Sequence, residues 1–205
     1  EQIDLGVNLS QRDFTDIDVL SVKKKFGVEG DYLYFVGTLE PRKNLVRLVE
    51  GYARLLEEKK WEGKLVISGK KGWYYDEIFA AAEKNNLKDK VIFTGFVTDE
   101  EKFVLIKGAK CLCYLSLYEG FGLPILEGMA MGTPVVAANN SSLPEVAGEM
   151  AILVDPTNID EIVAGLTQVV FDKTKRQEMI IGGYERVKKY TWEKAARKIN
   201  NLINN

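Results

Sequence analysis

Short apolar segments alternate along the chain with longer segments in which apolar residues recur every three or four positions. The short segments run continuously apolar instead of alternating with polar residues, and they are rich in Val, Ile, Leu and aromatic residues. This pattern is typical of strands that are buried on both faces of a parallel sheet. Six strands are predicted, at residues 31–37, 64–69, 91–97, 111–117, 134–138 and 151–155.

Amphipathic patterns between these segments predict helices. In residues 44–60, for example, Leu45, Leu48, Val49 and Tyr52 share one helical face. The predicted helices cover residues 44–60, 76–86, 99–109 and 124–132, followed by 158–172, 174–190 and 191–205. Alternating strands and helices favour an α/β fold with a Rossmann-like, doubly wound parallel sheet.

Composition narrows the class of protein. The chain has 205 residues, 46% of them hydrophobic, and a formal net charge of −2, so charge gives no indication of a nucleic-acid partner. It contains no histidine, which excludes Ser-His-Asp and Cys-His catalysis within these residues. Cys111 and Cys113 share one face of a predicted strand and are interpreted as core residues. No signal peptide or membrane span is recognisable, so a cytoplasmic location is expected, in which the protein could act at the inner face of the membrane.

Ligands of doubly wound sheets bind where strands end and helices begin, so the loops after the strands carry the candidate chemistry. The first loop reads "VGTLEPRKN". Gly37 ends the strand, and Arg42 and Lys43 immediately precede a helix, where free amide groups and two cations would form an anion site. The alternative is a solvated basic pair. No Walker motif is present.

The loop after residues 91–97 offers a second candidate. The backbone of Val97 lies at a strand end, and the Asp99 side chain is a hydrogen-bond acceptor, so the two could hold a flat heterocycle. The alternative use of Thr98 or Asp99 is to cap the following helix.

The stretch "SLYEGFGLPILEGMAMGTPVV" is the most informative. Gly120 and Gly122 permit a tight turn with outward amides, and Pro124 suits the first position of a helix. Glu127 is expected in the first helical turn, reaching back towards Glu119 so that both carboxylates border one cavity. Carboxylates that accept from diols, beside amides that bind phosphate, fit a nucleotide sugar. The alternative is that Glu127 only complements the helix dipole and that Glu119 is solvated.

These motifs resemble the C-terminal, donor-binding domain of retaining family-4 glycosyltransferases of the GT-B fold, and look most like the bacterial polysaccharide mannosyltransferases. The similarity runs in order through "VGTLEPRKN", "VIFTGFV", "SLYEGFGLPILEGMAMGTPVVAANNSSLPEVAG", "AILVDP" and "YTWEKAARKI". The segment "LGVNL" at residues 5–9 is similar to an interdomain strand exit of these enzymes.

The resemblance implies three catalytic residues. Glu119 would contact hydroxyl groups of the donor sugar, and Lys43 would neutralise the diphosphate. Many members carry an arginine directly after the strand-end glycine, where this chain has Thr38. Arg42 would supply that charge or point to solvent.

The resemblance also implies a set of donor-binding residues. Glu127 would bind the ribose, and Val97 and Asp99 would meet the base. Guanine presents two adjacent donors that suit the Asp99 carboxylate, so a GDP-sugar is favoured over a UDP-sugar. The complete donor-binding set is Gly37, Val97, Asp99, Gly120, Phe121, Gly122, Leu123 and Glu127.

The implied organisation has three parts. Residues 1–30 would form an interdomain linker and a lead-in helix, residues 31–190 the donor-binding domain, and residues 191–205 a helix that packs on an N-terminal domain outside these residues. That domain would contribute the acceptor site. The expected reaction moves a hexose, mannose being favoured, to a saccharide or lipid-linked acceptor, with no cofactor and no metal. A nucleotide-sugar epimerase and a non-catalytic nucleotide-binding module are the alternatives.

Overall fold

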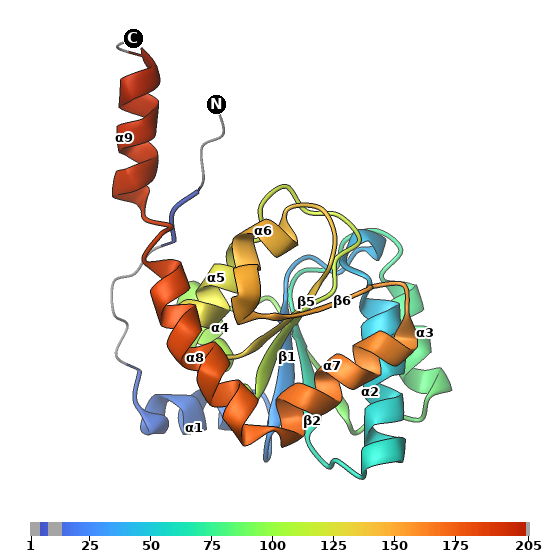
Figure 1. Cartoon of the computed structure of the whole chain (residues 1–205). Coiled ribbons are helices and arrows are strands. Elements are labelled where there is room, and N and C mark those ends of the chain that lie inside the picture. Colours follow the sequence, from blue (N-terminus) through green and yellow to red (C-terminus); the bar gives the residue numbers. More distant parts are fainter. Residues whose placement is uncertain (1–4, 8–13, 204–205) are drawn as a thin grey trace.

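The computed structural model describes residues 5–7 and 14–203, and its centre is one parallel sheet (Figure 1). The six strands follow the order β3-β2-β1-β4-β5-β6, and every neighbouring pair is parallel. The α/β prediction with six strands is therefore confirmed. The strands are β1 (Tyr32–Val36), β2 (Lys64–Ser68), β3 (Val91–Gly95), β4 (Cys111–Tyr114), β5 (Val135–Ala138) and β6 (Ile152–Val154).

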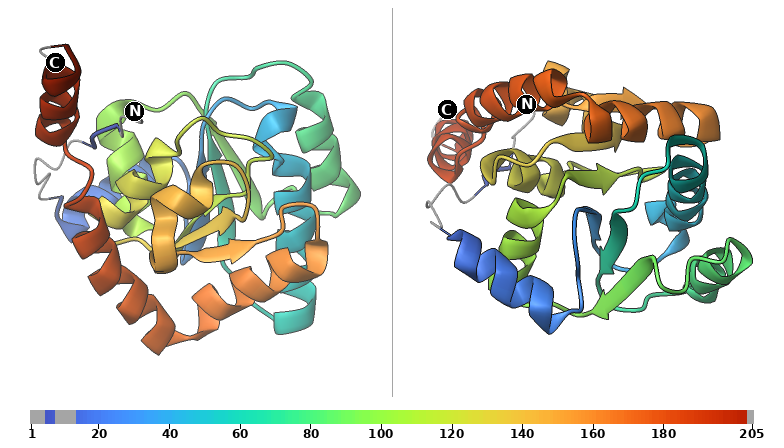
Figure 2. Two further views of the ribbon diagram at one scale, coloured as in Figure 1. Left: turned by 45° about the horizontal axis from the view of Figure 1, so that its top comes forward. Right: turned by 90° about the horizontal axis from the view of Figure 1, so that it is seen from below.

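Helices cover both faces of the sheet. On one side α2 packs on α3 and α7, and on the other α4 packs on α1 and α5, with α8 on α5. The view from below shows the sheet between these two groups (Figure 2). The helices are α1 (Asp16–Lys25), α2 (Leu45–Lys59), α3 (Asp76–Lys84), α4 (Asp99–Gly108), α5 (Leu123–Ala130), α6 (Leu143–Ala147), α7 (Ile159–Phe171), α8 (Lys173–Val187) and α9 (Trp192–Ile203), with short 3₁₀ turns η1 (Pro41–Lys43) and η2 (Gly148–Met150).

The core forms where these layers meet: β4 and β5 are buried along their whole length, and β1 and β2 at all but one terminal residue each. Tyr34 pairs in register with Val66 of β2 and Leu112 of β4, and all three are fully buried. Cys111 and Cys113 are buried and unpaired, as predicted for core residues. The neighbouring Cys111 thiol and burial raise the pKa of Cys113, so this thiol stays protonated.

The strand order places two chemically rich loops side by side. From β1 the chain adds β2 and β3 on one side of the sheet, and from β4 it adds β5 and β6 on the other. The order of the strands therefore reverses between β1 and β4, although all strands stay parallel. A crevice opens at such a reversal, beyond the carboxyl ends of the strands. The Leu117 amide donates to the Arg42 carbonyl at 2.8 Å, which ties the loop after β4 to η1.

Asn44 strengthens this connection from the end of η1. Its backbone is left-handed, with φ of 59°, a conformation that asparagine tolerates better than most residues. The buried side-chain amide donates to the carbonyls of Leu115 at 3.1 Å and Pro156 at 2.7 Å. Residues Arg42 and Lys43 are therefore held against the loop that follows β4.

Two local predictions were wrong. Helix α5 begins at Leu123 with Gly122 as its N-cap, so Pro124 occupies the second helical position and not the first. Glu127 is consequently the fifth helical residue and lies in the second turn, not the first. Helix α6 was not predicted, because its five residues, "LPEVA", are too short to show a period.

Helix α9 stands apart from the rest of the molecule (Figure 1). Ala195 is its buried residue, whereas Trp192, Ile199, Leu202 and Ile203 are exposed apolar side chains. The proposal that residues 191–205 pack on another domain, and the division at residues 30 and 190, stay predictions. Part of the predicted linker, residues 1–4 and 8–13, including the end of "LGVNL", lies outside the described residues. Among the helices that the structure describes, none is long and apolar enough to cross a membrane.

Candidate functional site

Glu119 lies at the centre of an ion-pair network where the β1 and β4 loops meet. Its Oε1 is 2.6 Å from the Lys43 Nζ, and its Oε2 is 2.9 Å from an Arg42 guanidinium nitrogen. The side chains of Lys43 and Glu119 are only 9% and 11% exposed. The sequence separates these groups by 76 residues, and the reversal of strand order brings them into contact.

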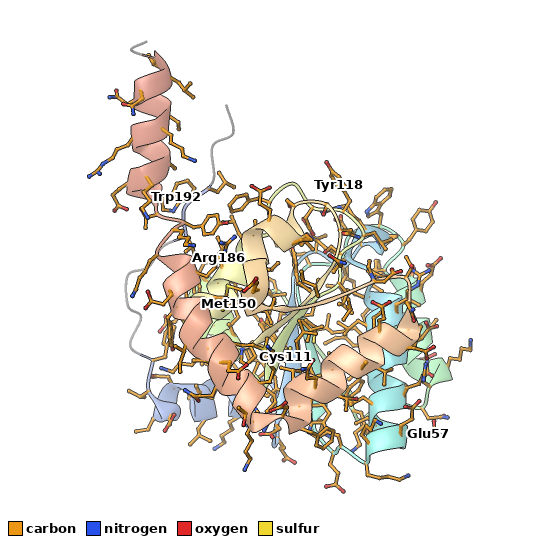
Figure 3. The ribbon with its side chains drawn as sticks, viewed as in Figure 1. Glu57, Cys111, Tyr118, Met150, Arg186 and Trp192 are labelled. Carbon is orange, nitrogen blue, oxygen red and sulfur yellow. The ribbon has the colours of Figure 1, made fainter. Side chains whose placement is uncertain are left out.

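The structure settles where Arg42 points. Its guanidinium also donates to the Glu40 carboxylate and to the Tyr118 carbonyl, both at 2.7 Å. Tyr118 lies at the rim of the loops, at the opposite end of the molecule from Glu57 (Figure 3). The Arg42 side chain is 39% exposed but faces Glu119, so it supplies a second cation to the site.

Tyr114, the last residue of β4, completes the network and was missed by the sequence analysis. Its hydroxyl accepts from Lys43 at 3.1 Å and donates to Glu119 at 2.9 Å. Burial, followed by the negative charge of Glu119, raises the pKa of Tyr114, so the phenol remains a neutral donor. Its position at the end of the strand before "SLYEGFG" was the available signal.

Electrostatics hold Glu119 in its charged form. Burial alone would raise the pKa of this carboxyl, but hydrogen bonds and charges from Lys43 and Arg42 outweigh burial and keep the pKa below its usual range. Gly37 leaves room beside this cluster, because a Cβ there would lie 3.1 Å from the Phe35 ring and 3.6 Å from the Lys43 side chain. Glu119 is thus held as a carboxylate within a compact network of two cations and a neutral phenol.

The glycine-rich turn after Glu119 presents unused amide groups. Gly122 has φ of 110° as the N-cap of α5, a conformation that favours glycine. The Ser142 hydroxyl donates to the carbonyls of Glu119 and Phe121, which fixes the turn. Within residues 5–7 and 14–203, the N–H groups of Gly120, Phe121, Gly122 and Leu123 donate to no other group. Free amides at a helix N-terminus are suited to bind an anion.

Glu127 belongs to a second cluster. Its Oε1 is 2.7 Å from the Nζ of Lys102, and that same nitrogen is 3.4 Å from Asp99. Lys102 therefore connects Glu127, which was predicted to bind the ribose, with Asp99, which was predicted to bind the base. The sequence analysis missed it because a lysine on a charged helix carries no distinctive pattern.

The N-cap of α4 shows whether Asp99 caps its helix or is left for a ligand. Thr98 is the N-cap and forms a capping box with Glu101, while the Asp99 side chain is 80% exposed. Asp99 is thus not engaged in capping its helix. Val97 is buried, and in the part of the chain that the structure describes its peptide group forms no hydrogen bond. Of the two groups predicted for the base site, the Val97 peptide group is therefore without a hydrogen bond in the described residues, and the exposed Asp99 carboxylate has only the longer contact with Lys102.

The two clusters have the chemistry to hold a phosphate and a diol, whereas the prediction that Glu119 and Glu127 border one cavity stays a prediction. Two cations and a run of free amides suit a diphosphate, and two carboxylates suit vicinal hydroxyl groups. In this state each cation is already paired with a carboxylate, so a ligand would exchange these contacts instead of filling an empty charged site. The described residues contain no group of three or more His, Cys, Asp or Glu placed to hold a metal ion.

Comparisons with known proteins agree with this picture. The model of the family "Glycosyl transferases group 1" matches residues 16–186. The O-antigen chain mannosyltransferase B of Escherichia coli is 38% identical over 162 residues, which are 79% of this chain and 42% of that protein. Other mannosyltransferases of Escherichia coli are 28% identical, and the chain covers about a quarter of their length. The chain therefore spans less than half of these curated relatives.

Solved structures show the same fold. Sucrose-phosphate synthase from Thermosynechococcus elongatus superposes with a TM-score of 0.84 at 25% identity, covering 100% of this chain and 52% of that one. HepE from Anabaena, in complex with UDP and glucose, gives a TM-score of 0.85 at 19% identity, with 98% and 56% covered. The matched family model, the mannosyltransferase relatives and the shared GT-B architecture together show that this chain belongs to the group 1 glycosyltransferases.

Proposed function

We propose that this chain is the donor-binding half of a retaining glycosyltransferase, which moves mannose from a nucleoside-diphosphate sugar to a saccharide or lipid-linked acceptor. The observation that carries this proposal is the contact of Lys43, Arg42 and Glu119 beside the free amides of residues 120–123. The relative O-antigen chain mannosyltransferase B supports mannose as the hexose. The comparisons favour neither an epimerase nor a non-catalytic module.

Each group has a role in the proposed reaction. Lys43, Arg42 and the turn amides would stabilise the charge that develops on the departing diphosphate. Glu119 would accept hydrogen bonds from the donor sugar and is not a nucleophile. The departing phosphate would help to deprotonate the acceptor hydroxyl on the same face of the sugar. We propose that the reaction needs no metal or cofactor, because Lys43, Arg42 and the turn amides would neutralise the negative charge of the diphosphate.

Donor binding would exchange the existing ion pairs. The diphosphate would take Lys43 and Arg42 from Glu119, which frees that carboxylate for sugar hydroxyls. The ribose would in the same way take Glu127 from Lys102. Because the cations keep an anionic partner throughout, they stay compensated in both states.

The base is proposed to be guanine, bound by Asp99 and the free peptide group of Val97. Asp99 is exposed and does not cap its helix, which supports this assignment. HepE is in complex with UDP, but it is only 19% identical to this chain, so its nucleotide does not set the base proposed here. A cytoplasmic location at the inner face of the membrane, where a lipid-linked acceptor would lie, is part of the proposal.

Calorimetric titration with GDP, UDP and ADP tests the donor site. We expect GDP to bind most tightly and Asp99→Ala to remove its advantage over UDP. A preference for UDP would overturn the choice of base, and a GDP preference that survives Asp99→Ala would overturn the role of Asp99. If the folded domain binds none of the three, the donor-site proposal is wrong.

A pair of variants tests the ribose contact. Glu127→Ala should lower the affinity for GDP by at least about tenfold, since a hydrogen bond to a charged group contributes about 1.5–3 kcal/mol. Glu58→Ala is the matched control, because Glu58 is also an acid in an ion pair, with Arg54, but lies near the far end of α2. Equal GDP affinity in wild type and Glu127→Ala would contradict the assignment.

A further inference from the structure

Two large aromatic side chains next to the donor site lie outside the hydrophobic core. Trp73 and Tyr74 follow β2 and are 62% and 70% exposed. Tyr75, the next residue, packs edge-to-face on Phe79 with ring centroids 5.9 Å apart. The neighbouring Trp73 and Tyr74 rings lie 6.1 Å apart. The segment thus places one aromatic residue in the packed layer and leaves two others facing solvent.

The backbone of this aromatic segment is tightly constrained. The Gly72 amide donates to the Leu39 carbonyl at 3.0 Å, and a Cβ on Gly72 would lie only 2.8 Å from that oxygen. Tyr74 has φ of 50°, a left-handed conformation that is rare for a bulky residue. Such a conformation is unfavourable by about 1–3 kcal/mol and persists where the surroundings impose it.

Beside Tyr74 the surface is hollowed into a cavity of about 370 Å³. This is within the usual range of small-molecule pockets, about 300–1,000 Å³. Its apolar walls include Tyr74 and Leu117, and its charged lining includes Glu40, Glu50, Glu77 and Arg47. Three carboxylates and one guanidinium give this cavity a negative charge, which disfavours phosphate and other anions.

The chemistry of the cavity fits a neutral, hydroxyl-rich ring. The C–H face of a hexopyranose can pack on an aromatic side chain, while its hydroxyl groups donate to carboxylates and accept from arginine. Glu50 and Glu77 have no hydrogen-bond or ion-pair partner in the described parts of the chain, so both can accept from a ligand.

Glu40 links this cavity to the donor site. It accepts from the Trp73 indole at 3.3 Å and from Arg42 at 2.7 Å, and Arg42 in turn contacts Glu119. We infer that the cavity beside Trp73 and Tyr74 binds a hexopyranose unit of the saccharide acceptor, at a distance from the reacting hydroxyl. This inference rests on the proposed glycosyl transfer, and it assigns acceptor recognition to the donor-binding domain itself.

Mannotriose is the probe that tests the inference, with the chain as it stands. In ¹H–¹⁵N NMR spectra, mannotriose should shift the indole resonance of Trp73 and leave those of Trp61 and Trp192 in place. Replacing Tyr74 by Ala should lower the affinity for mannotriose about tenfold, which corresponds to about 1.4 kcal/mol. Tyr74→Asn removes the ring but suits the left-handed backbone, so a loss of binding in this variant cannot be ascribed to unfolding.

Controls separate this site from the donor site. Phe171→Ala removes a half-exposed ring at the end of α7 and should not change mannotriose affinity. GDP affinity should stay the same in Tyr74→Asn. If wild type binds GDP but no mannotriose, or if Tyr74→Asn binds mannotriose like wild type, the inference is wrong and the donor site stands. If the folded chain binds neither ligand, both are wrong.

Discussion

Replacing Glu119 by Gln should lower the stability of the ligand-free protein but strengthen GDP binding. The substitution keeps the shape of the side chain and removes its charge, which leaves Lys43 buried without its anion. Breaking a buried pair typically destabilises by about 3–5 kcal/mol. Arg42 is 39% exposed and can be solvated, and Lys43 keeps the Tyr114 hydroxyl and ring. We therefore expect a loss of about 2 kcal/mol, or about 4–8 °C in Tm.

GDP affinity should move in the opposite direction. In the wild type the diphosphate must displace Glu119 from Lys43, whereas in Glu119→Gln that competitor carries no charge. A charge-assisted contact of about 1.5 kcal/mol corresponds to about a tenfold gain in affinity. Saturating GDP should accordingly narrow the difference in Tm between the variant and the wild type, because binding to the native state stabilises it.

Calorimetry and thermal melts with and without GDP measure both effects. Glu58→Gln makes the same change of charge in an exposed ion pair with Arg54, and should change neither quantity. Adding Lys43→Met to Glu119→Gln should abolish the gain in affinity. Should folded Glu119→Gln bind GDP no better than wild type, Glu119 does not compete with the diphosphate for Lys43 and the exchange of ion pairs is refuted.

Three further predictions concern stability, measured as urea unfolding midpoints. The pKa of Glu119 is lowered in the folded state, so this carboxylate stabilises the protein above the unfolded pKa of about 4.3, and the stabilisation is lost as pH falls from there through the folded pKa. The difference in unfolding midpoint between wild type and Glu119→Gln should therefore shrink below about pH 4. A difference that stays constant with pH would contradict this. Gly122→Ala should destabilise by about 1–3 kcal/mol, since φ is 110° and the new Cβ would lie 2.7 Å from Leu143, whereas Gly120→Ala meets no atom within 4 Å and should be nearly neutral. Asn44→Ala should destabilise by about 1–3 kcal/mol because it leaves two buried carbonyls without a donor; an unchanged midpoint would show that water replaces the amide.

The sequence determined the elements of this fold because each has a strong local signal. Continuous apolar runs located all six strands, and the spacing of Leu45, Leu48 and Tyr52 located α2 within one residue at either end. The glycine-rich turn and its carboxylates were visible as a motif. Boundaries were less accurate, since a strand ends where its hydrogen-bonded neighbour ends, and α6 has too few residues to show a period.

Only the tertiary structure decided which charges meet. Nothing local relates Lys43 to Glu119, or Lys102 to Glu127; both contacts depend on how strands and helices are arranged around the sheet. From the chain alone, Arg42 could face a ligand or solvent, and either Thr98 or Asp99 could cap the following helix. The structure resolves Arg42 through its contacts with Glu119, Glu40 and Tyr118, and it resolves the cap through the hydrogen bonds between Thr98 and Glu101. A buried cation such as Lys43 needs an anionic partner in reach, because burying an unpaired charge is unfavourable. The charged groups of the site can therefore be identified in the sequence, but which of them pair is determined by the arrangement of strands and helices.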